Sequence, residues 1–417
     1  MSSRVLALDR NGRGPDASGV SDVRIIALVS SAHLLSHFLQ LALPPLFPLL
    51  RADFGVSYAA LGVLMTVFFA ASGLGQAISG FLVDRFGAKR ILVGGLSLLA
   101  GAVAGAALVG SYETLIPILV VAGLGNSVFH PADYSIMNAA IDPRRLGRAY
   151  STHSVCGSLG WALSPIVVGG LAALFGWRVA LVSVGCAGLL VAAVLGRQQA
   201  LAEGQRAVAA RAMRGPAGLG AGIRFLLAAP LLMAFAYFVL LASSMSAVQT
   251  FSVSVLVTLY EAPLALASGA LTAYLVGSTA GILVGGVLAD RMRRHDFIAG
   301  GGMLLAATLT LVLASGGPAL ALLAPVMAIM GFAKGVTSPS RDLLVRAATP
   351  AGASGKVFGF VYSGLDLGAL AMPPVYGWLM DRGEPRMVLI VAAGLMVLTT
   401  FTVLEVRRRG LAAQAPA

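Results

Sequence analysis

Twelve long apolar runs, separated by short polar segments, occupy most of this chain of 417 residues. An α-helix needs about 20 apolar residues to cross a bilayer, and the runs lie at 23–50, 57–83, 89–110, 113–140, 147–173, 178–197, 225–258, 264–290, 297–315, 319–347, 354–380 and 386–406. Only 11% of the residues are charged, whereas a soluble domain carries about 25%. The sequence therefore predicts an all-α polytopic membrane protein and excludes a soluble enzyme, a disordered chain and a disulfide scaffold.

One long polar gap divides the twelve runs into two sets of six. The expected organisation is therefore a tail at 1–22, a six-helix half at 23–197, a central linker at 198–224, a second six-helix half at 225–406 and a tail at 407–417. The two halves repeat each other in sequence. GFLVDRFGAKR (80–90) matches GGVLADRMRR (285–294), and GLGNSVFHP (123–131) matches GFAKGVTSP (331–339). Parallel repeats of this kind predict a substrate site near the membrane midplane, between the halves.

The distribution of positive charge predicts the orientation of the chain. Most of the 29 Lys and Arg residues lie in the tails, the central linker and the loops that follow every second run, and the loops on the opposite side hold Arg51, Arg178, Arg382 and Arg386. Lys and Arg collect on the cytoplasmic side of a membrane. Both termini are therefore predicted to be cytoplasmic, in a bacterial-type inner membrane. The net charge of +12 then reflects orientation, and no nucleic-acid partner is expected.

Several of these segments resemble a known family. GFLVDRFGAKR resembles the G-x-x-x-D-R-x-G-x-K-R signature of the major facilitator superfamily. GLGNSVFHPADYSI (123–136) and GRAYSTHSVCGSLGWALSP (147–165) resemble its fosmidomycin-resistance branch. TSPSRDLLVRAATP (337–350) fits that branch less closely and also fits a carboxylate-transporting neighbour. The resemblance covers the whole chain. It implies twelve helices in two pseudo-symmetric halves, with helices 1, 4, 7 and 10 lining a central cavity.

The charged signature between the second and third runs is expected to gate the cavity. Asp84 is predicted to lie at the start of the third helix, where a carboxylate complements the positive helix end. The cluster would hold helices together in one state and release them in the other; the alternative is simple positive-inside anchoring. The expected gating residues are Gly80, Asp84, Arg85, Gly87, Lys89 and Arg90, together with Asp290 and Arg291 in the second half.

The fifth run contains a series of small residues around Gly160, Pro165 and Gly169. Small residues allow helices to approach closely, so plain packing is the simplest interpretation. The series also resembles the antiporter signature of the superfamily's fifth helix, although Ser164 and Val168 depart from that pattern.

Ionisable residues within the apolar runs are the candidate functional residues, because charge in hydrocarbon is costly. Helical spacing predicts that they form stripes, each on one helix face. The stripes are His33, His37 and Gln40 in the first run, Asn126, His130 and Asp133 in the fourth, and Lys334, Ser338 and Arg341 in the tenth. The repeat aligns the fourth run with the tenth. Because the resemblance implies that both of these helices line the cavity, their stripes are expected to face each other across it.

The chemistry of these stripes suggests a division of labour between the halves. His130 and Asp133 are predicted to take up and release a proton, since histidine titrates near neutral pH. Lys334 and Arg341 are predicted to hold an anionic group, because the guanidinium matches carboxylate and phosphonate geometry. The alternative is an Asp133–Arg341 ion pair that latches one state. Asp366, an acid in the Gly-rich eleventh run, is a candidate second proton site or a partner for these cations.

The remaining histidines are interpreted as structural or pore-lining. His33 and His37 are spaced as a metal-binding pair, but their stripe offers no third ligand, so polar pore lining is expected and no metal is predicted. His153 is expected to pack helices or to lie at the membrane interface.

The sequence as a whole predicts a secondary transporter rather than an enzyme, with no cofactor. Its partners would be a small-molecule substrate, protons and the lipid bilayer, and it is expected to work as a monomer. We expect a proton-coupled exporter of small anionic molecules, as the fosmidomycin-resistance resemblance implies. One alternative is a proton-coupled importer of a carboxylate. Another is a non-transporting sensor, which the two facing polar stripes disfavour.

Overall fold

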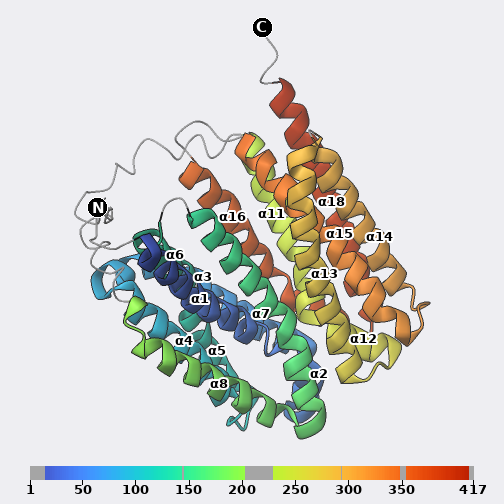
Figure 1. The fold of residues 1–417 in the computed structure, drawn as a ribbon. Coiled ribbons are helices and arrows are strands. Elements are labelled where there is room, and N and C mark those ends of the chain that lie inside the picture. Colours follow the sequence, from blue (N-terminus) through green and yellow to red (C-terminus); the bar gives the residue numbers. More distant parts are fainter. Residues whose placement is uncertain (1–14, 143–144, 202–228, 293, 348–353, 413–417) are drawn as a thin grey trace, which may run out of the picture.

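The computed structural model describes residues 15–142, 145–201, 229–292, 294–347 and 354–412. These residues form helices and turns, with no strand among them. Eleven helical segments within them are long and apolar enough to cross a membrane. The predicted all-α membrane fold is therefore confirmed. The segments fall into two groups, drawn in blue to green and in yellow to red in Figure 1.

The first half contains six membrane-crossing units. They are α1 (Pro15–Gln40) with η1 (Pro44–Leu46) and α2 (Phe47–Phe54), α3 (Tyr58–Phe86), α4 (Ala88–Ala106), α5 (Tyr112–Asn126) with α6 (Phe129–Ala140), α7 (Leu146–Phe175) and α8 (Trp177–Arg197).

The second half follows the same plan. Its units are α11 (Ala229–Ser246) with the π-helical η2 (Ala247–Phe251) and α12 (Ser252–Tyr260), α13 (Leu264–Arg291), α14 (His295–Ala314), α15 (Leu320–Ala347), α16 (Ser354–Ala371) with α17 (Pro373–Asp381), and α18 (Pro385–Ala412). The pair α16 and α17 occupies the remaining predicted run, 354–380.

Several predicted boundaries differ from the observed ones. Helix α1 begins at Pro15 rather than at 23, and α18 continues to Ala412 rather than ending at 406. The expected tail residues 1–14 and 413–417 and the linker from 202 onwards lie outside the described residues. The expectation that Asp84 starts the third helix is wrong, since α3 runs on to Phe86. The chain turns at Gly87, whose φ of 88° suits a residue without Cβ, and α4 starts at Ala88.

Prolines divide two of the predicted runs. Helix α5 ends at Asn126 and α6 begins at Phe129, so Asn126 and His130 do not share one continuous helix face as predicted. Pro131 lies in the first turn of α6, where its missing N–H and its ring exclude a helix that continues from the preceding turn. Pro373 begins α17 after α16 for the same reason.

The sequence repeat appears again in the packing of equivalent helices. Gly123 of α5 lies against α3, where an added Cβ would collide with the carbonyl oxygen of Phe68. Gly331 of α15 lies against α13 in the same way, opposite the carbonyl oxygen of Tyr274. The two glycines are equivalent in the sequence repeat, so each half uses the same close helix contact.

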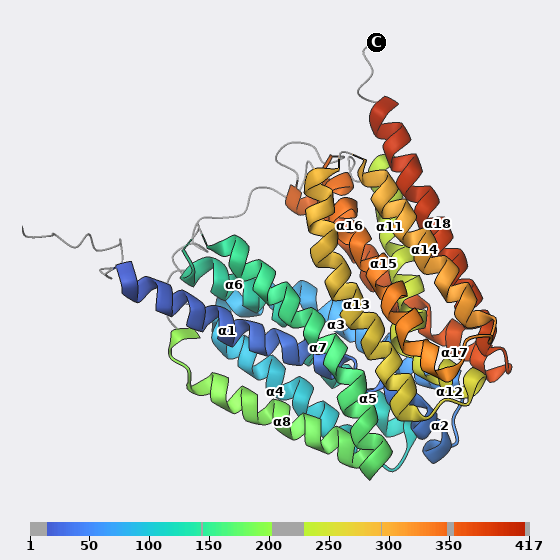
Figure 2. The same cartoon turned by 45° about the vertical axis from the view of Figure 1, so that its right-hand side comes forward.

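The two halves meet where α3 packs on α16 and α17, and where α7 packs on α13. The Thr66 hydroxyl donates to the carbonyl of Leu370 at 2.7 Å, and the Thr272 hydroxyl donates to that of Ala162 at 2.8 Å. Figure 2 shows the halves side by side around α2, α12 and α17 and diverging towards α6 and the start of α16. The molecule is therefore closed between the halves on the side of α2 and α12.

The Asp381 side chain forms two hydrogen bonds between the halves on this closed side. Its two carboxylate oxygens accept hydrogen bonds from the backbone N–H groups of Tyr58 at 2.7 Å and Ala59 at 2.8 Å. These N–H groups belong to the first turn of α3, which has no helical acceptors of its own and carries the positive end of the helix dipole. A side chain from the second half thus caps a helix of the first half.

We predict that Asp381→Asn weakens this closure. One of the two N–H groups loses its acceptor and the charge is removed, which costs about 1 kcal/mol and shifts the ratio of closed to open molecules about fivefold. Distances between spin labels on α3 and α17 would report the shift. The control is Asp53→Asn, since Asp53 pairs with Arg178 within the first half at 2.8 Å. Equal distance distributions for Asp381→Asn and wild type would contradict the prediction.

Candidate functional site

A cavity of about 600 Å³ lies between the two halves. Helices α1, α3, α5, α6 and α7 line it from the first half, and α11, η2 and α16 line it from the second. Its polar lining consists of His33, Ser36, His37, Gln40, Ser72, Gln76, Asn126, His130, Trp161, Ser246, Gln249, Thr250, Ser363 and Asp366. Since both halves contribute, any movement between them changes the shape of the cavity.

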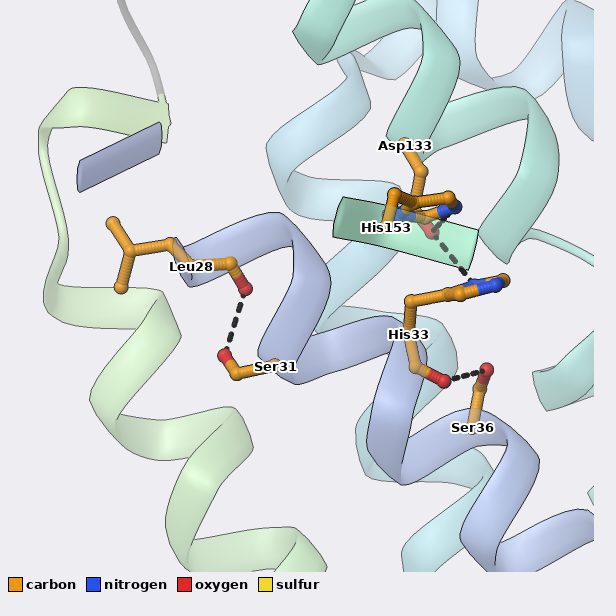
Figure 3. A network of polar contacts seen from close by, with 6 residues as sticks. All are labelled: Leu28, Ser31, His33, Ser36, Asp133 and His153. Carbon is orange, nitrogen blue, oxygen red and sulfur yellow. Dashed lines mark hydrogen bonds and ion pairs between the residues drawn. The ribbon is translucent and has the colours of Figure 1, made fainter. Parts of the chain in front are cut away.

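A buried carboxylate lies behind the wall that the first half forms. Asp133 is 0% exposed, and its Oδ2 atom lies 3.3 Å from Nδ1 of His33 and 3.7 Å from Nε2 of His153. Figure 3 shows its side chain directed towards both histidines, which come from two other helices. Three helices, α1, α6 and α7, therefore place their ionisable side chains around one carboxyl group.

The histidine rings form a continuous cluster from this carboxylate to the cavity. The ring centroids of His33 and His153 are 3.7 Å apart and stacked. The ring centroid of His33 lies 4.4 Å from that of His37 and 5.3 Å from that of His130. His37 and His130 line the cavity, and His130 is exposed. A proton or an ion in the cavity therefore has a path of adjacent ring nitrogens to Asp133.

The packing of α1 on α7 fixes this arrangement. A Cβ on Gly157 would lie 2.7 Å from Nε2 of His33, and one on Gly160 would collide with the backbone of Leu34. One turn after Gly157, the Trp161 indole N–H donates to Oε1 of Gln40 at 3.1 Å. The small residues of α7 thus bring its backbone close enough for the His33 ring to fit between the helices.

Several buried polar atoms of this cluster lack a hydrogen-bond partner within the described part of the chain. They are both carboxylate oxygens of Asp133, both ring nitrogens of His153, and the Nδ1 atoms of His33 and His37. Buried polar atoms are nearly always satisfied in folded proteins. The cluster is therefore suited to hold a proton, a water molecule or an ion.

The structure brings most of the predicted site residues together. His33, His37, Gln40, Asn126, His130 and Asp366 line the cavity, and Asp133 lies behind it. The Asn126 amide also donates to the Ser72 hydroxyl at 3.0 Å. Lys334 and Arg341 are not among the lining residues: Lys334 is buried on α15, and the Arg341 guanidinium lies 4.7 Å from the centroid of the Phe238 ring.

The predicted gating residues lie at the opposite end of α3 from the closed contacts. Arg85 and Arg90 are exposed, and the Arg85 guanidinium lies 5.3 Å from the Phe86 ring centroid. Arg291 is likewise exposed at the end of α13. The side chains of Asp84 and Asp290 lie outside the described residues. Among the predicted packing residues, Gly160 faces α1, Gly169 faces Ser268 across the two halves, and Pro165 lies within α7.

His153 is the site residue that the sequence analysis did not assign. It is 1% exposed, lies next to Asp133 and stacks on His33 of α1, so the helix-packing interpretation holds and the interfacial one is wrong. The spacing of His153 from the small residues of α7 indicates which face of the helix it occupies. His153, Gly157, Gly160 and Ser164 follow one another at helical intervals, so His153 shares the small-residue face that packs on α1.

The comparisons with known proteins agree with this architecture. The family model described as "Major Facilitator Superfamily" matches residues 29–269 and 241–417. The fosmidomycin resistance protein of Escherichia coli (strain K12) is 28% identical over 152 residues, which are 36% of this chain and 37% of that protein. The 4-hydroxybenzoate transporter PcaK of Pseudomonas putida is 30% identical over 149 residues, 36% of this chain and 33% of that protein. Each alignment thus spans about a third of the curated relative.

Solved structures match over nearly the whole chain. A bacterial homologue of the human lysosomal transporter Spinster, in an inward-facing and occupied conformation, has a TM-score of 0.76 at 16% identity and covers 97% of this chain and 100% of its own. The xylose transporter XylE from E. coli, in an inward open conformation, has a TM-score of 0.71 at 14% identity, with 92% and 96% covered. These matches show the fold, and the resemblance found in the sequence is confirmed.

The close fit of α7 against His33 gives a testable prediction. Gly157→Ala places a methyl group against a ring that already stacks on His153, so the ring is displaced from Asp133. We expect transport to fall about tenfold, the effect of about 1.4 kcal/mol, while the protein still folds. Substrate uptake or efflux in cells, normalised to the amount of protein in the membrane, measures this.

Gly170→Ala is the matched control on the same helix, because an added methyl group there contacts nothing within 4 Å. Equal transport by the Gly157→Ala and Gly170→Ala variants would show that the position of the His33 ring is unimportant.

Proposed function

The chain belongs to the Major Facilitator Superfamily, and we propose that it is a proton-coupled secondary transporter of small organic anions that works by alternating access. Proteins of this family move small molecules across membranes and are not enzymes. The observation that carries the proposal is the cavity between the halves, with an ionisable cluster buried behind one of its walls.

We assign proton coupling to the cluster around Asp133. Its carboxylate contacts His33 and His153, and the ring of His130 extends the cluster to the cavity. Intramembrane acids and histidines that face a cavity are the groups that form proton relays in transporters. Asp366 lines the same cavity from the second half and is the candidate second proton site.

We assign substrate binding to the polar side chains that line the cavity. Asn126, His37 and His130 offer hydrogen-bond donors from the first half, and Gln249 offers one from the second. Lys334 and Arg341 keep their proposed role as the positive charges that attract an anion. Since they do not line the cavity in this conformation, that role requires a long-range effect or a contact made in another state.

The relatives support an anionic substrate. The names of two of them refer to 4-hydroxybenzoate and L-galactonate, both carboxylates. A cavity of about 600 Å³ is within the range of sites for small organic molecules.

We propose that the described conformation faces the cytoplasm. The halves are closed around α2 and α12, and the side that carries Arg85, Lys89 and Arg90 is the positively charged one, which positive-inside asymmetry assigns to the cytoplasm. This orientation makes both termini cytoplasmic in an inner membrane. The neighbours described as inward-facing and inward open support the same assignment. In the opposite state, the loop after α3 would act as the gate, and a single chain is sufficient for this cycle.

For the direction of transport, we propose export, as in the fosmidomycin resistance protein. The alternative is import of a carboxylate, which the 30% identity with the 4-hydroxybenzoate transporter supports. A deletion strain separates the two: sensitivity to a compound favours export, and failure to grow on a carboxylate as carbon source favours import.

The test of coupling uses purified protein in liposomes that contain a pH-sensitive dye. A proton gradient is imposed, and phosphonates, monocarboxylates and hydrophobic cations are added in turn. We expect a phosphonate or a carboxylate to trigger proton movement, and the sign of that movement gives the direction. Asp133→Asn is expected to abolish the proton movement, and Arg341→Gln to reduce it.

Asp53→Asn is the control in this assay, because Asp53 pairs with Arg178 on α8, outside the cavity. Normal transport by both Asp133→Asn and Arg341→Gln would refute the proposed division of labour. Proton movement with hydrophobic cations alone would refute the anionic substrate.

A further inference from the structure

We propose that His33, His130, His153 and Asp133 form a binding site for a divalent transition-metal ion, with Zn²⁺ as the ion that fits best. The nitrogen atoms of the three histidines that could ligate an ion all lie within 4.8 Å of one another. They come from three different helices, α1, α6 and α7, so an ion bound to them would link these helices. Binding of the ion is inferred independently of the proposed transport function; only the effect of zinc on transport rests on it.

The spacing of the donor atoms suits a small tetrahedral ion. Zinc binds imidazole nitrogen and carboxylate oxygen at about 2.0–2.2 Å, which places neighbouring tetrahedral ligands about 3.4 Å apart. The observed separations from Oδ2 of Asp133 are 3.3 Å to Nδ1 of His33 and 3.7 Å to Nε2 of His153. Oδ2 of Asp133 therefore already lies close to the required spacing from both nitrogens, and the donor nitrogens of His33, His130 and His153 lie within 4.8 Å of one another.

The burial of three of the four donors is the second observation that points to a ligand. His33 is 3% exposed, His153 is 1% exposed and Asp133 is 0% exposed. The ring nitrogens and carboxylate oxygens that face one another lack hydrogen-bond partners in the described part of the chain. A cation bound between them would compensate the buried carboxylate and use the lone pairs that are left over.

The donor set selects the class of ion. Three imidazoles and one carboxylate suit zinc and its transition-metal neighbours, whereas magnesium and calcium prefer sites built from oxygen atoms. With all four positions filled by protein, a bound ion would have no open coordination position, as in structural zinc sites.

The sequence predicts no metal site because it shows only the ligands that share one face of α1. His33 and His37 are one turn apart, but no third ligand lies on that stripe. The structure instead pairs His33 with ligands from α6 and α7, and His37 is not one of the three histidines whose donor atoms converge. The site is therefore formed between helices and not along one of them.

The test is metal binding by the full chain in detergent, purified with an affinity tag that contains no histidine. After dialysis against Zn²⁺ and then against buffer, we expect one equivalent of zinc per chain by elemental analysis. Competition with a chromophoric chelator should show at least a hundredfold weaker binding in His33→Ala, His130→Ala and His153→Ala. Co²⁺ in place of zinc should give the visible absorption of a tetrahedral site.

His37→Ala and His295→Ala are the matched controls, because His37 lies in the same cavity wall without converging on the other donors and His295 begins α14 in the other half. Both should keep one equivalent of zinc. Zinc should also raise the melting temperature of the wild type and of both controls, but not that of His153→Gln, which keeps a polar side chain where alanine leaves a cavity.

Two results would overturn the site: wild type that retains no zinc, or a His37→Ala or His295→Ala variant that loses as much affinity as His153→Ala. The transport assay is run separately with a chelator present. Loss of zinc binding and loss of transport are therefore distinguishable. Since an ion and a proton use the same lone pairs, the zinc-loaded protein should transport less than the chelated one.

Discussion

The cost of enclosing Asp133 is the constraint on which the site depends. A carboxyl group that is 0% exposed inside a membrane protein has no water to solvate it, and an isolated charge in that environment is strongly unfavourable. The histidines of α1 and α7 lie against its oxygen atoms without a hydrogen bond to them among the described residues, so a proton or a cation is needed to offset the buried charge. The close approach of α1 and α7 at Gly157 and Gly160 places the His33 ring against Gly157, within reach of the carboxylate. In this half, the packing of α1 on α7 and the surroundings of Asp133 therefore depend on the same residues.

Much of the fold could be predicted from the sequence. Apolar runs are the dominant signal in a chain that must satisfy its backbone hydrogen bonds without water, so they predict the helices. Matching segments at 80–90 and 285–294 predict the twofold repeat. Helix breaks at proline are harder to predict from the sequence. The interruption at Pro131 separates Asn126 from His130, and a helical wheel drawn through the break gives a false common face. The π-helical segment Ala247–Phe251 changes the helical register in a similar way, and it brings Gln249 and Thr250 to the cavity.

The candidate site could be predicted only in part, for a different physical reason. Helical periodicity relates residues within one helix, and it correctly grouped His33 with His37. It contains no information about which helices are neighbours. The partners of His153 lie on α1 and α6, so its position on α7 could suggest helix packing but could not identify those partners. The predicted facing of Asp133 and Arg341 assumed that α15 lines the cavity. In this conformation α15 instead packs against α13, with the Arg341 guanidinium over Phe238 of α11.

The two sides of the contact between Asp381 and the start of α3 differ in their sensitivity to mutation. On one side it depends on a single side chain, whereas on the other it uses backbone N–H groups that every residue except proline provides. Substitutions at Tyr58 or Ala59 that leave the helix intact therefore preserve the contact, and almost any change at Asp381 removes it. Compensating mutations for a lost Asp381 cannot arise at its direct partners. They must arise elsewhere in the interface, so sequence covariation between these positions would not reveal that they touch.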